Sequence, residues 1–192
     1  MDCSKISANL AMASCRNAVA GIMGEAILIN FDDWMAAKNA QNITKTNSVI
    51  SAISLGSGVY GYKFTSHERA FEASVQLQKG TYNSAFAHQL IMRAFDRTQN
   101  LKNDINKIAN GRYVAIVLNR DSANPETVYE VYGEENGLVA TAIEFNSTDG
   151  DGVAYAITLA SEDNARESEV PTSIYVTSLA ATKTMVDALV AA

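Results

Sequence analysis

The segment FEASVQLQ (residues 71–78) gives the clearest indication of the fold in this sequence. Apolar side chains (Phe71, Ala73, Val75 and Leu77) alternate there with polar ones (Glu72, Ser74, Gln76 and Gln78). Because successive side chains of a β-strand point to opposite faces of its sheet, one face of this strand is apolar and the other is polar. The segment therefore predicts a strand in a sheet that is half exposed to water.

Other segments of the chain have the apolar and β-branched composition of strands, and turn residues separate several of them. They are residues 25–31 (EAILINF), 85–95 (AFAHQLIMRAF), 113–118 (YVAIVL), 128–132, 138–145 and 154–159. The continuous apolar run at 113–118 is typical of a strand that is buried on both faces, so we expect it at the centre of the sheet.

The residues before 71–78 predict a hairpin. Two β-rich runs, 49–55 and 59–64, flank a Gly-Ser-Gly link, which favours a tight connection between paired strands. Residues 56–61 (GSGVYG) also match the glycine pattern of dinucleotide-binding proteins, but that pattern requires a helix directly after it. Here a strand-like segment follows, so a hairpin tip is the better interpretation.

Two helices are expected. Leu101, Ile105 and Ile108 fall at helical spacing, with Thr98 able to cap the start and Gly111 the end, which predicts a helix over residues 99–109. The spacing of the apolar residues near the C-terminus predicts a second helix over residues 178–190. Residues 34–38 fit a turn or one helical turn.

The whole chain therefore predicts a mainly β fold with flanking helices, arranged as an antiparallel β-sandwich or barrel. About eight strands are expected and the helices do not alternate with them. Residues 1–24 show no sustained period of either kind and are expected to form an N-terminal arm, followed by a single domain over residues 25–192.

Composition narrows the classes of partner. The 192 residues carry a formal net charge of -6 and a pI of about 4.9, which does not favour tight DNA binding, since that normally begins with clustered Lys and Arg. No apolar run is long enough to span a bilayer, so no membrane partner is expected. The two cysteines, Cys3 and Cys15, provide no disulfide framework.

No catalytic, cofactor or metal site can be assembled from the sequence, and we expect a protein that is not an enzyme. His67 and His88 are the only histidines, and His88 is better interpreted as a hydrogen-bonded core or interface residue. The acid pairs Asp32-Asp33 and Glu134-Glu135 lie beside turns and are interpreted as solvated charge. Residues 147–152 resemble half of a calcium loop, but Thr158 stands where that loop needs a glutamate.

The order of these segments resembles that of a known family. The segments that carry the likeness are EAILINFDD, ISLGSGVYGYKF, FEASVQLQKGTYNSAFAHQL, NLKNDINKIANGRYVAIV, VYEVYGEENGLVATAIEF and GVAYAITLAS. In pattern and order they are similar to small structural proteins of phages of Bacteroidetes-type hosts, whose architecture is similar to that of phage tail-tube proteins. The likeness covers most of the chain and contains no diagnostic motif.

The resemblance implies how copies of the chain would assemble. Six copies would close an inner barrel as a ring, and stacked rings would form the conduit for DNA ejection, joined by the N-terminal arm, the C-terminus and a hairpin containing Leu55, Gly56, Ser57, Gly58 and Val59. Partners would be further copies and other tail proteins, with DNA only passing through. The subunit would be made in the host cytoplasm and reside in the tail of the virion.

Glu72, Gln76 and Gln78 are the candidates for the wall of the lumen. DNA carries about one charge per 1.7 Å of axis, so a basic wall would hold it, whereas a neutral or acidic wall would let it slide. The alternative is that this polar face is simply the outer surface of the protein.

Two other classes of protein remain open at this point. One is a different virion part, such as a head-tail connector, a baseplate protein or a capsid decoration protein, because one small β fold can serve all of them. The other is a bacterial surface lipoprotein, which only the residues around Cys15 favour.

Overall fold

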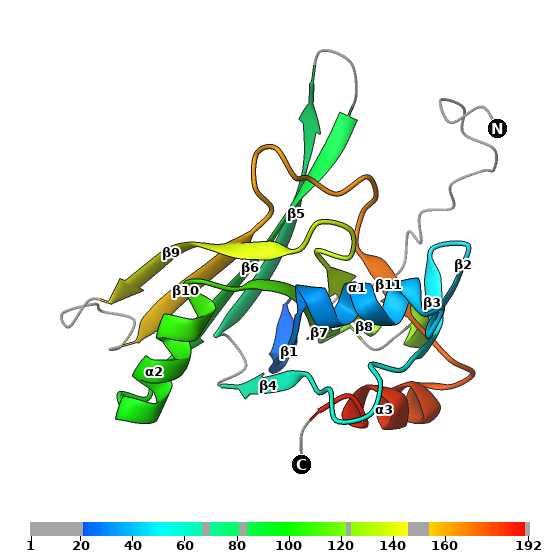
Figure 1. Cartoon of the computed structure of the whole chain (residues 1–192), viewed down its shortest axis with the longest axis horizontal. Coiled ribbons are helices and arrows are strands. Elements are labelled where there is room, and N and C mark those ends of the chain that lie inside the picture. Colours follow the sequence, from blue (N-terminus) through cyan, green and yellow to red (C-terminus); the bar gives the residue numbers. More distant parts are fainter. Residues whose placement is uncertain (1–20, 67–69, 81–83, 122–123, 146–153, 191–192) are drawn as a thin grey trace.

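A computed structural model describes residues 21–66, 70–80, 84–121, 124–145 and 154–190 (Figure 1). The arm up to residue 20, with Cys3 and Cys15, lies outside these ranges, as do His67 and residues 147–152. The described residues form a mainly β structure with three α-helices beside one sheet of eleven strands. The predicted mainly β fold with flanking helices is confirmed.

The helices are α1 (Phe31–Asn39), α2 (Gln99–Ile108) and α3 (Leu179–Asp187), with a 3-10 turn η1 (Pro125–Thr127). The strands are β1 (Ile22–Asn30), β2 (Ile43–Thr46), β3 (Val49–Ile53), β4 (Tyr62–Thr65), β5 (Phe71–Lys79), β6 (Ser84–Ala94), β7 (Arg112–Asn119), β8 (Tyr129–Tyr132), β9 (Leu138–Phe145), β10 (Tyr155–Ala160) and β11 (Thr172–Ile174).

The sheet divides into two branches at β7. β1 pairs along one edge of β7, and β8 and β9 pair in succession along the other. From β8 the sheet continues through β11 and β3 to β2, and from β9 through β10 and β6 to β5, while β4 pairs with β1. Every pairing is antiparallel except that of β11 with β3. Since β2 and β5 end separate branches, the sheet is not closed, and the alternative of a barrel within one chain is wrong.

β7 is buried on both faces, as the apolar run at 113–118 predicted, and so is β1 from Ala26 to Ile29. Ala115 and Val117 point into one core, which packs against β5, β6 and β10, and Val114 and Ile116 point into a second core beneath α1 and α3. None of these four side chains is more than 1% exposed. The two strands therefore hold two apolar cores together.

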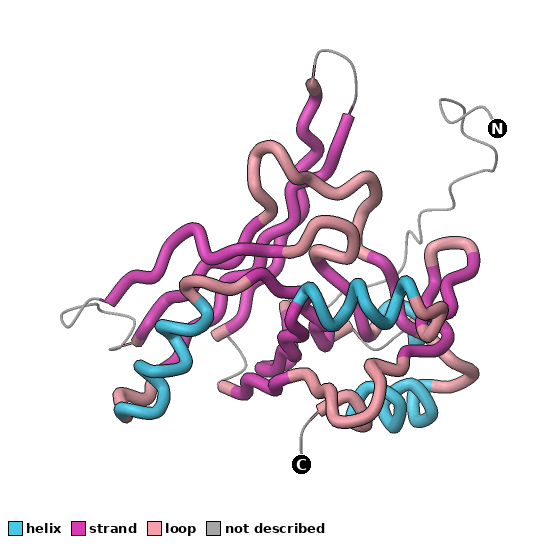
Figure 2. Tube along the Cα trace, in the orientation of Figure 1, coloured by secondary structure: helices cyan, strands magenta, loops and turns pink. Residues whose placement is uncertain are grey.

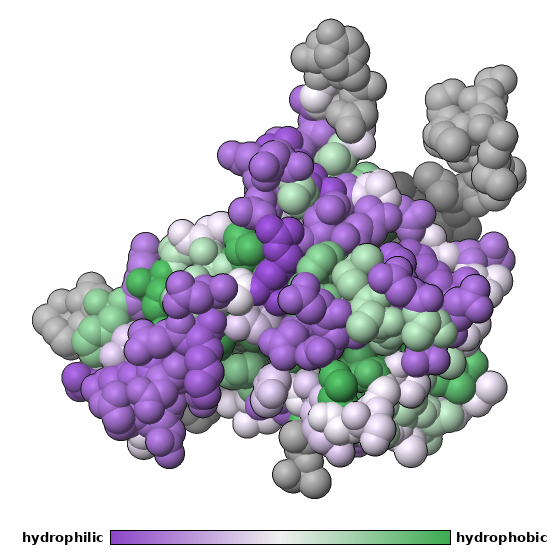
Figure 3. All heavy atoms as spheres, viewed as in Figure 1, coloured by the Kyte–Doolittle hydropathy of each residue, from purple (hydrophilic) through white to green (hydrophobic). Residues whose placement is uncertain are grey.

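The helices follow their sequence signals. The Thr98 hydroxyl accepts a hydrogen bond from the Leu101 N–H at the start of α2, as predicted for its cap, and Ile105 and Ile108 are buried. Hydrophilic residues cover the exposed side of α2 (Figure 3). Ser178 caps α3, which ends three residues before the predicted position 190. Residues 34–38, for which the sequence predicted a turn or one helical turn, belong to the longer helix α1.

The predicted hairpin around residues 56–58 is wrong. β3 pairs with β2 and β11, whereas β4 pairs with β1 (Figure 2). The connection between them crosses from one branch to the edge of β1, because Leu55 and Val59 pack into the second core instead of pairing with each other across a turn. Positive φ angles at Gly56 and Gly58 (+97° and +77°) allow this course.

One boundary of the prediction changes, and two short strands were not predicted. β1 begins at Ile22, which is buried, so residues 22–24 belong to the domain and not to the arm. The polar residues 43–46 and the short segment 172–174 are strands that the sequence did not indicate. Both are too short to show an alternating pattern of their own.

Candidate functional site

The branch β9–β10–β6–β5 carries a face that points away from the first core. We call it the polar face, and it consists of Glu72, Ser74, Gln76, Gln78, Ala85, Ala87, Gln89, Ile91, Arg93, Ala142, Glu144, Ala156, Thr158 and Ala160. The structure places all three candidate wall residues on it: Glu72 and Gln76 are exposed and Gln78 is partly exposed. The strand predicted at 71–78 is thus half exposed, as its alternation indicated.

The polar face is nearly uncharged. The Arg93 guanidinium lies 2.6 Å from the Glu72 carboxylate, so these two charges offset one another. The Ser74 hydroxyl donates to the Gln89 side-chain oxygen across the two strands at 3.1 Å. Glu144 is the remaining carboxylate among the described residues of this face. The Glu72 carboxylate is therefore paired, and this face does not present it to solvent as an isolated negative charge.

Both outer edges of this branch are open. Within the described residues β5 pairs only with β6, and β9 pairs with β7 only at Leu138 and Val139. The edge of β5 and that of β9 beyond Val139 therefore have no described strand hydrogen-bonded to them, although β1 comes within 8 Å of β5, measured between Cα atoms. Such edges present rows of backbone N–H and C=O groups that can pair with another chain.

The hydrogen-bond pattern of β5 shows which groups face outward. The Arg93 N–H donates to the Ala70 carbonyl at the start of the β5–β6 ladder. In an antiparallel pair, directly opposite residues alternate between hydrogen-bonded and non-hydrogen-bonded. With the observed register, Ser74 and Gln76 therefore bond to β6, whereas the backbone groups of Ala73, Val75 and Leu77 point to the open edge.

The direction of the two edge strands suits a closed ring. The four strands of the branch alternate in direction, so β9 and β5 run antiparallel to each other. Rotation of a copy about a ring axis preserves strand direction, so β5 of one copy would meet β9 of the next as an antiparallel pair. The contact joins different surfaces of the two copies, which is the type of interface that generates rings.

A second group of polar residues lies under the long loop between β10 and β11. We call it the polar clasp: His88, Glu134, Glu135, Glu167 and Thr172. Glu167 is 2% exposed and accepts hydrogen bonds from the backbone N–H groups of Glu135 (2.7 Å) and Asn136 (3.0 Å). Burial raises the pKa of the Glu167 carboxyl. The clasp fastens the loop to the turn between β8 and β9.

The interpretation of Glu134 as a solvated charge is wrong. This residue is 5% exposed, and its carboxylate accepts from the Thr172 hydroxyl (2.6 Å) and from the Lys45 ammonium (2.8 Å). It is a buried, paired charge, not a solvated one, because β2 and β11 supply its partners. Asp32 and Asp33 lie in the first turn of α1, where carboxylates suit the helix dipole.

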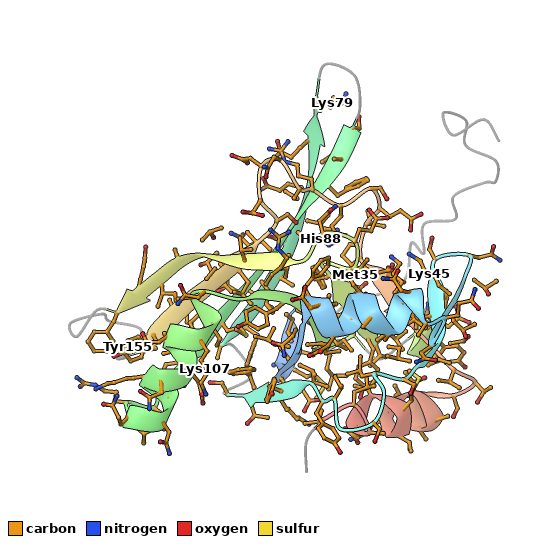
Figure 4. The ribbon with its side chains drawn as sticks, viewed as in Figure 1. Met35, Lys45, Lys79, His88, Lys107 and Tyr155 are labelled. Carbon is orange, nitrogen blue, oxygen red and sulfur yellow. The ribbon has the colours of Figure 1, made fainter. Side chains whose placement is uncertain are left out.

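His88 is a core histidine, as predicted. It is 2% exposed; its Nδ1 accepts from the Gly133 N–H (3.2 Å) and its Nε2 lies 3.0 Å from the Glu169 carbonyl, to which it donates (Figure 4). This pair of contacts requires the neutral ring with the proton on Nε2. Because both ring nitrogens are engaged and the adjoining cavity measures about 10 Å³, the clasp has no room for a substrate.

We expect His88 to make stability depend on pH. Burial lowers the pKa of His88 below its usual 6.5, with the Glu169 carbonyl and the carboxylates of Glu134 and Glu135 opposing the shift. The unfolded chain therefore binds a proton first as the pH falls, so stability is complete above pH 6.5 and declines from 6.5 down to the folded pKa. The loss is at most about 1.4 kcal/mol per pH unit for one proton.

Urea unfolding of the wild-type protein and the His88→Gln variant at pH 7.5 and 5.5 checks this. Glu167, whose pKa is raised, acts in the opposite direction, but it is present in both proteins and drops out of the comparison. The variant should lose less stability than the wild type between the two pH values. Equal losses would show that His88 does not contribute.

Among the residues that the structure describes, no group of His, Cys, Asp and Glu side chains could hold a metal ion. No helix in that same part is long and apolar enough to cross a membrane. Neither family models, nor curated proteins, nor solved structures gave a match to this chain.

Proposed function

We propose that this protein is the subunit of a phage tail tube, in which six copies form a ring and stacked rings form the conduit for DNA ejection. The observation that carries the proposal is a nearly uncharged, four-stranded face whose two edges, β5 and β9, are both open and run antiparallel. The resemblance in segment order supports the same assignment and supplies the number of copies.

The dimensions of such a ring suit the role. Six copies of four strands would make a barrel of 24 strands. With strands about 4.8 Å apart and tilted by about 40°, its backbone would be about 50 Å across. Side chains of the polar face take about 5 Å from each wall, since facing sheets pack about 10 Å apart. The remaining bore is wider than a DNA duplex.

The side chains of the polar face suit the passage of DNA. Small and uncharged groups predominate, and the single arginine is neutralised by Glu72. A wall of this kind offers no cluster of cations from which DNA would release counterions, so it does not hold the polyanion. The overall charge of -6 acts in the same direction.

Introducing cations into the wall should therefore retain DNA. The double variant Gln76→Lys/Gln78→Lys would place twelve additional lysines in each six-copy ring. We expect assembled tubes of this variant to bind duplex DNA in low salt and to release it as salt is raised, because counterion release makes the affinity depend steeply on salt. Wild-type tubes should not bind.

Gln99→Lys/Asn103→Lys on α2 also adds twelve lysines to each ring, at exposed residues outside the polar face, and should not create comparable DNA binding. Fluorescence anisotropy of a labelled duplex measures the wild-type protein and both double variants. If the Gln76→Lys/Gln78→Lys variant assembles but binds no DNA, the polar face does not line the bore.

A further inference from the structure

The β5–β6 hairpin has two different ends. At one end it projects from the body of the molecule, with Lys79 near its tip (Figures 1 and 4). At the other end, where β5 begins and β6 finishes, the surface is hollow. The two ends are separated by the length of β5, about 27 Å for eight steps of about 3.4 Å.

The projecting end carries apolar side chains that are exposed to solvent. Leu77 is 52% exposed, although it lies on the same side of the strand as Phe71, which is buried in the first core. Phe86 lies directly opposite Leu77 on β6 and is half-buried. Lys79 points to this same side by the alternation of the strand and is exposed. The end thus combines an apolar pair with one cation.

The hollow has the complementary character. It is a cavity of about 480 Å³ whose lining includes the charged residues Arg93 and Asp96 and the apolar residues Phe64, Phe71, Met92, Phe95, Leu101 and Ile157. Phe95 is 37% exposed and Asp96 is exposed. Hydrogen bonds from the Thr98 hydroxyl and the Arg97 N–H lower the pKa of the Asp96 carboxyl, so it is ionised at neutral pH. Because the Arg93 guanidinium pairs with Glu72, the hollow offers apolar walls and the Asp96 carboxylate to a cationic partner.

We propose that the projecting end of one copy, with Leu77, Phe86 and Lys79, inserts into this hollow on a copy in the next ring. The occupant is a second copy of this chain because the apolar pair matches the apolar walls and Lys79 matches Asp96. The two surfaces lie at opposite ends of one ribbon, so the contact repeats in one direction without closing, as a stack requires. This inference rests on the proposed tail-tube function.

A charge exchange tests the contact. Lys79→Glu and Asp96→Lys should each shorten the tubes seen by negative-stain electron microscopy at least tenfold, leaving mostly single rings. The double variant Lys79→Glu/Asp96→Lys should restore much of the length, because the pair is formed again with its charges exchanged. Lys102→Glu makes the same change of charge at a residue that lines neither surface and should leave the tubes at wild-type length.

Asp96→Lys also removes the hydrogen bonds that the Asp96 carboxylate accepts at the start of α2, so a variant on the other partner is needed. Leu77→Asp removes the apolar contact at the other partner and should also yield single rings. Wild-type tube lengths in both Leu77→Asp and Lys79→Glu would overturn this contact while leaving the rings in place. Absence of rings from the wild-type protein would overturn the proposed function, and this inference with it.

Discussion

Replacing Val75 by proline should leave a folded domain that no longer forms rings. The Val75 N–H points to the open edge of β5, so its loss breaks no hydrogen bond between described residues. Proline is tolerated on edge strands for this reason, and it blocks the addition of a further strand. Size-exclusion chromatography with light scattering should show a monomer where the wild type gives a ring.

The neighbouring residue provides the matched control. Gln76→Pro removes an N–H that bonds to β6, so it should lower the free energy of unfolding by about 1–3 kcal/mol. Val75→Ala accounts for the partly buried valine side chain and should still assemble. If Val75→Pro forms rings as readily as Val75→Ala, the β5 edge is not the ring contact.

Removing the Glu167 carboxylate should destabilise the domain by about 2–5 kcal/mol. Glu167→Ala leaves the backbone N–H groups of Glu135 and Asn136 without their acceptor at a site that is closed to water. The loop between β10 and β11 would also lose two of its hydrogen bonds to the turn after β8, while those made by Arg166 and Ser168 would remain. Urea denaturation measures the change.

Glu169 lies two residues further along the same loop and is the natural comparison. Its carboxylate is exposed and pairs with Lys45 at 3.2 Å, so Glu169→Ala should cost less than about 1 kcal/mol. Glu167→Gln keeps one acceptor oxygen and should fall between the two. Equal effects of Glu167→Ala and Glu169→Ala would contradict the account of the polar clasp.

Alternation and helical spacing were sufficient to predict much of the fold. The alternation at 71–77, the apolar run at 113–118 and the spacing of Leu101, Ile105 and Ile108 are local signals, and each produced the element it predicted. The half-exposed strand also located the polar face with its three candidate residues. Each of these signals depends on residues close together in the chain.

Features that depend on distant partners could not be predicted. Glu134 is buried because Lys45 and Thr172, from β2 and β11, supply its hydrogen bonds, and neither is near it in sequence. The supposed hairpin around Gly56 failed for a related reason, since β3 and β4 have partners elsewhere in the chain. The open edges of β5 and β9 likewise became visible only once the order of the strands was known.

Whether copies of this chain assemble at all can be seen by electron microscopy of the purified wild-type protein over a range of concentration and salt. We expect hollow rings of six copies that stack into tubes at high concentration. A single ring that never stacks would favour a head-tail connector instead. A protein that stays monomeric under every condition would contradict the claim that the open edges of β5 and β9 close a ring.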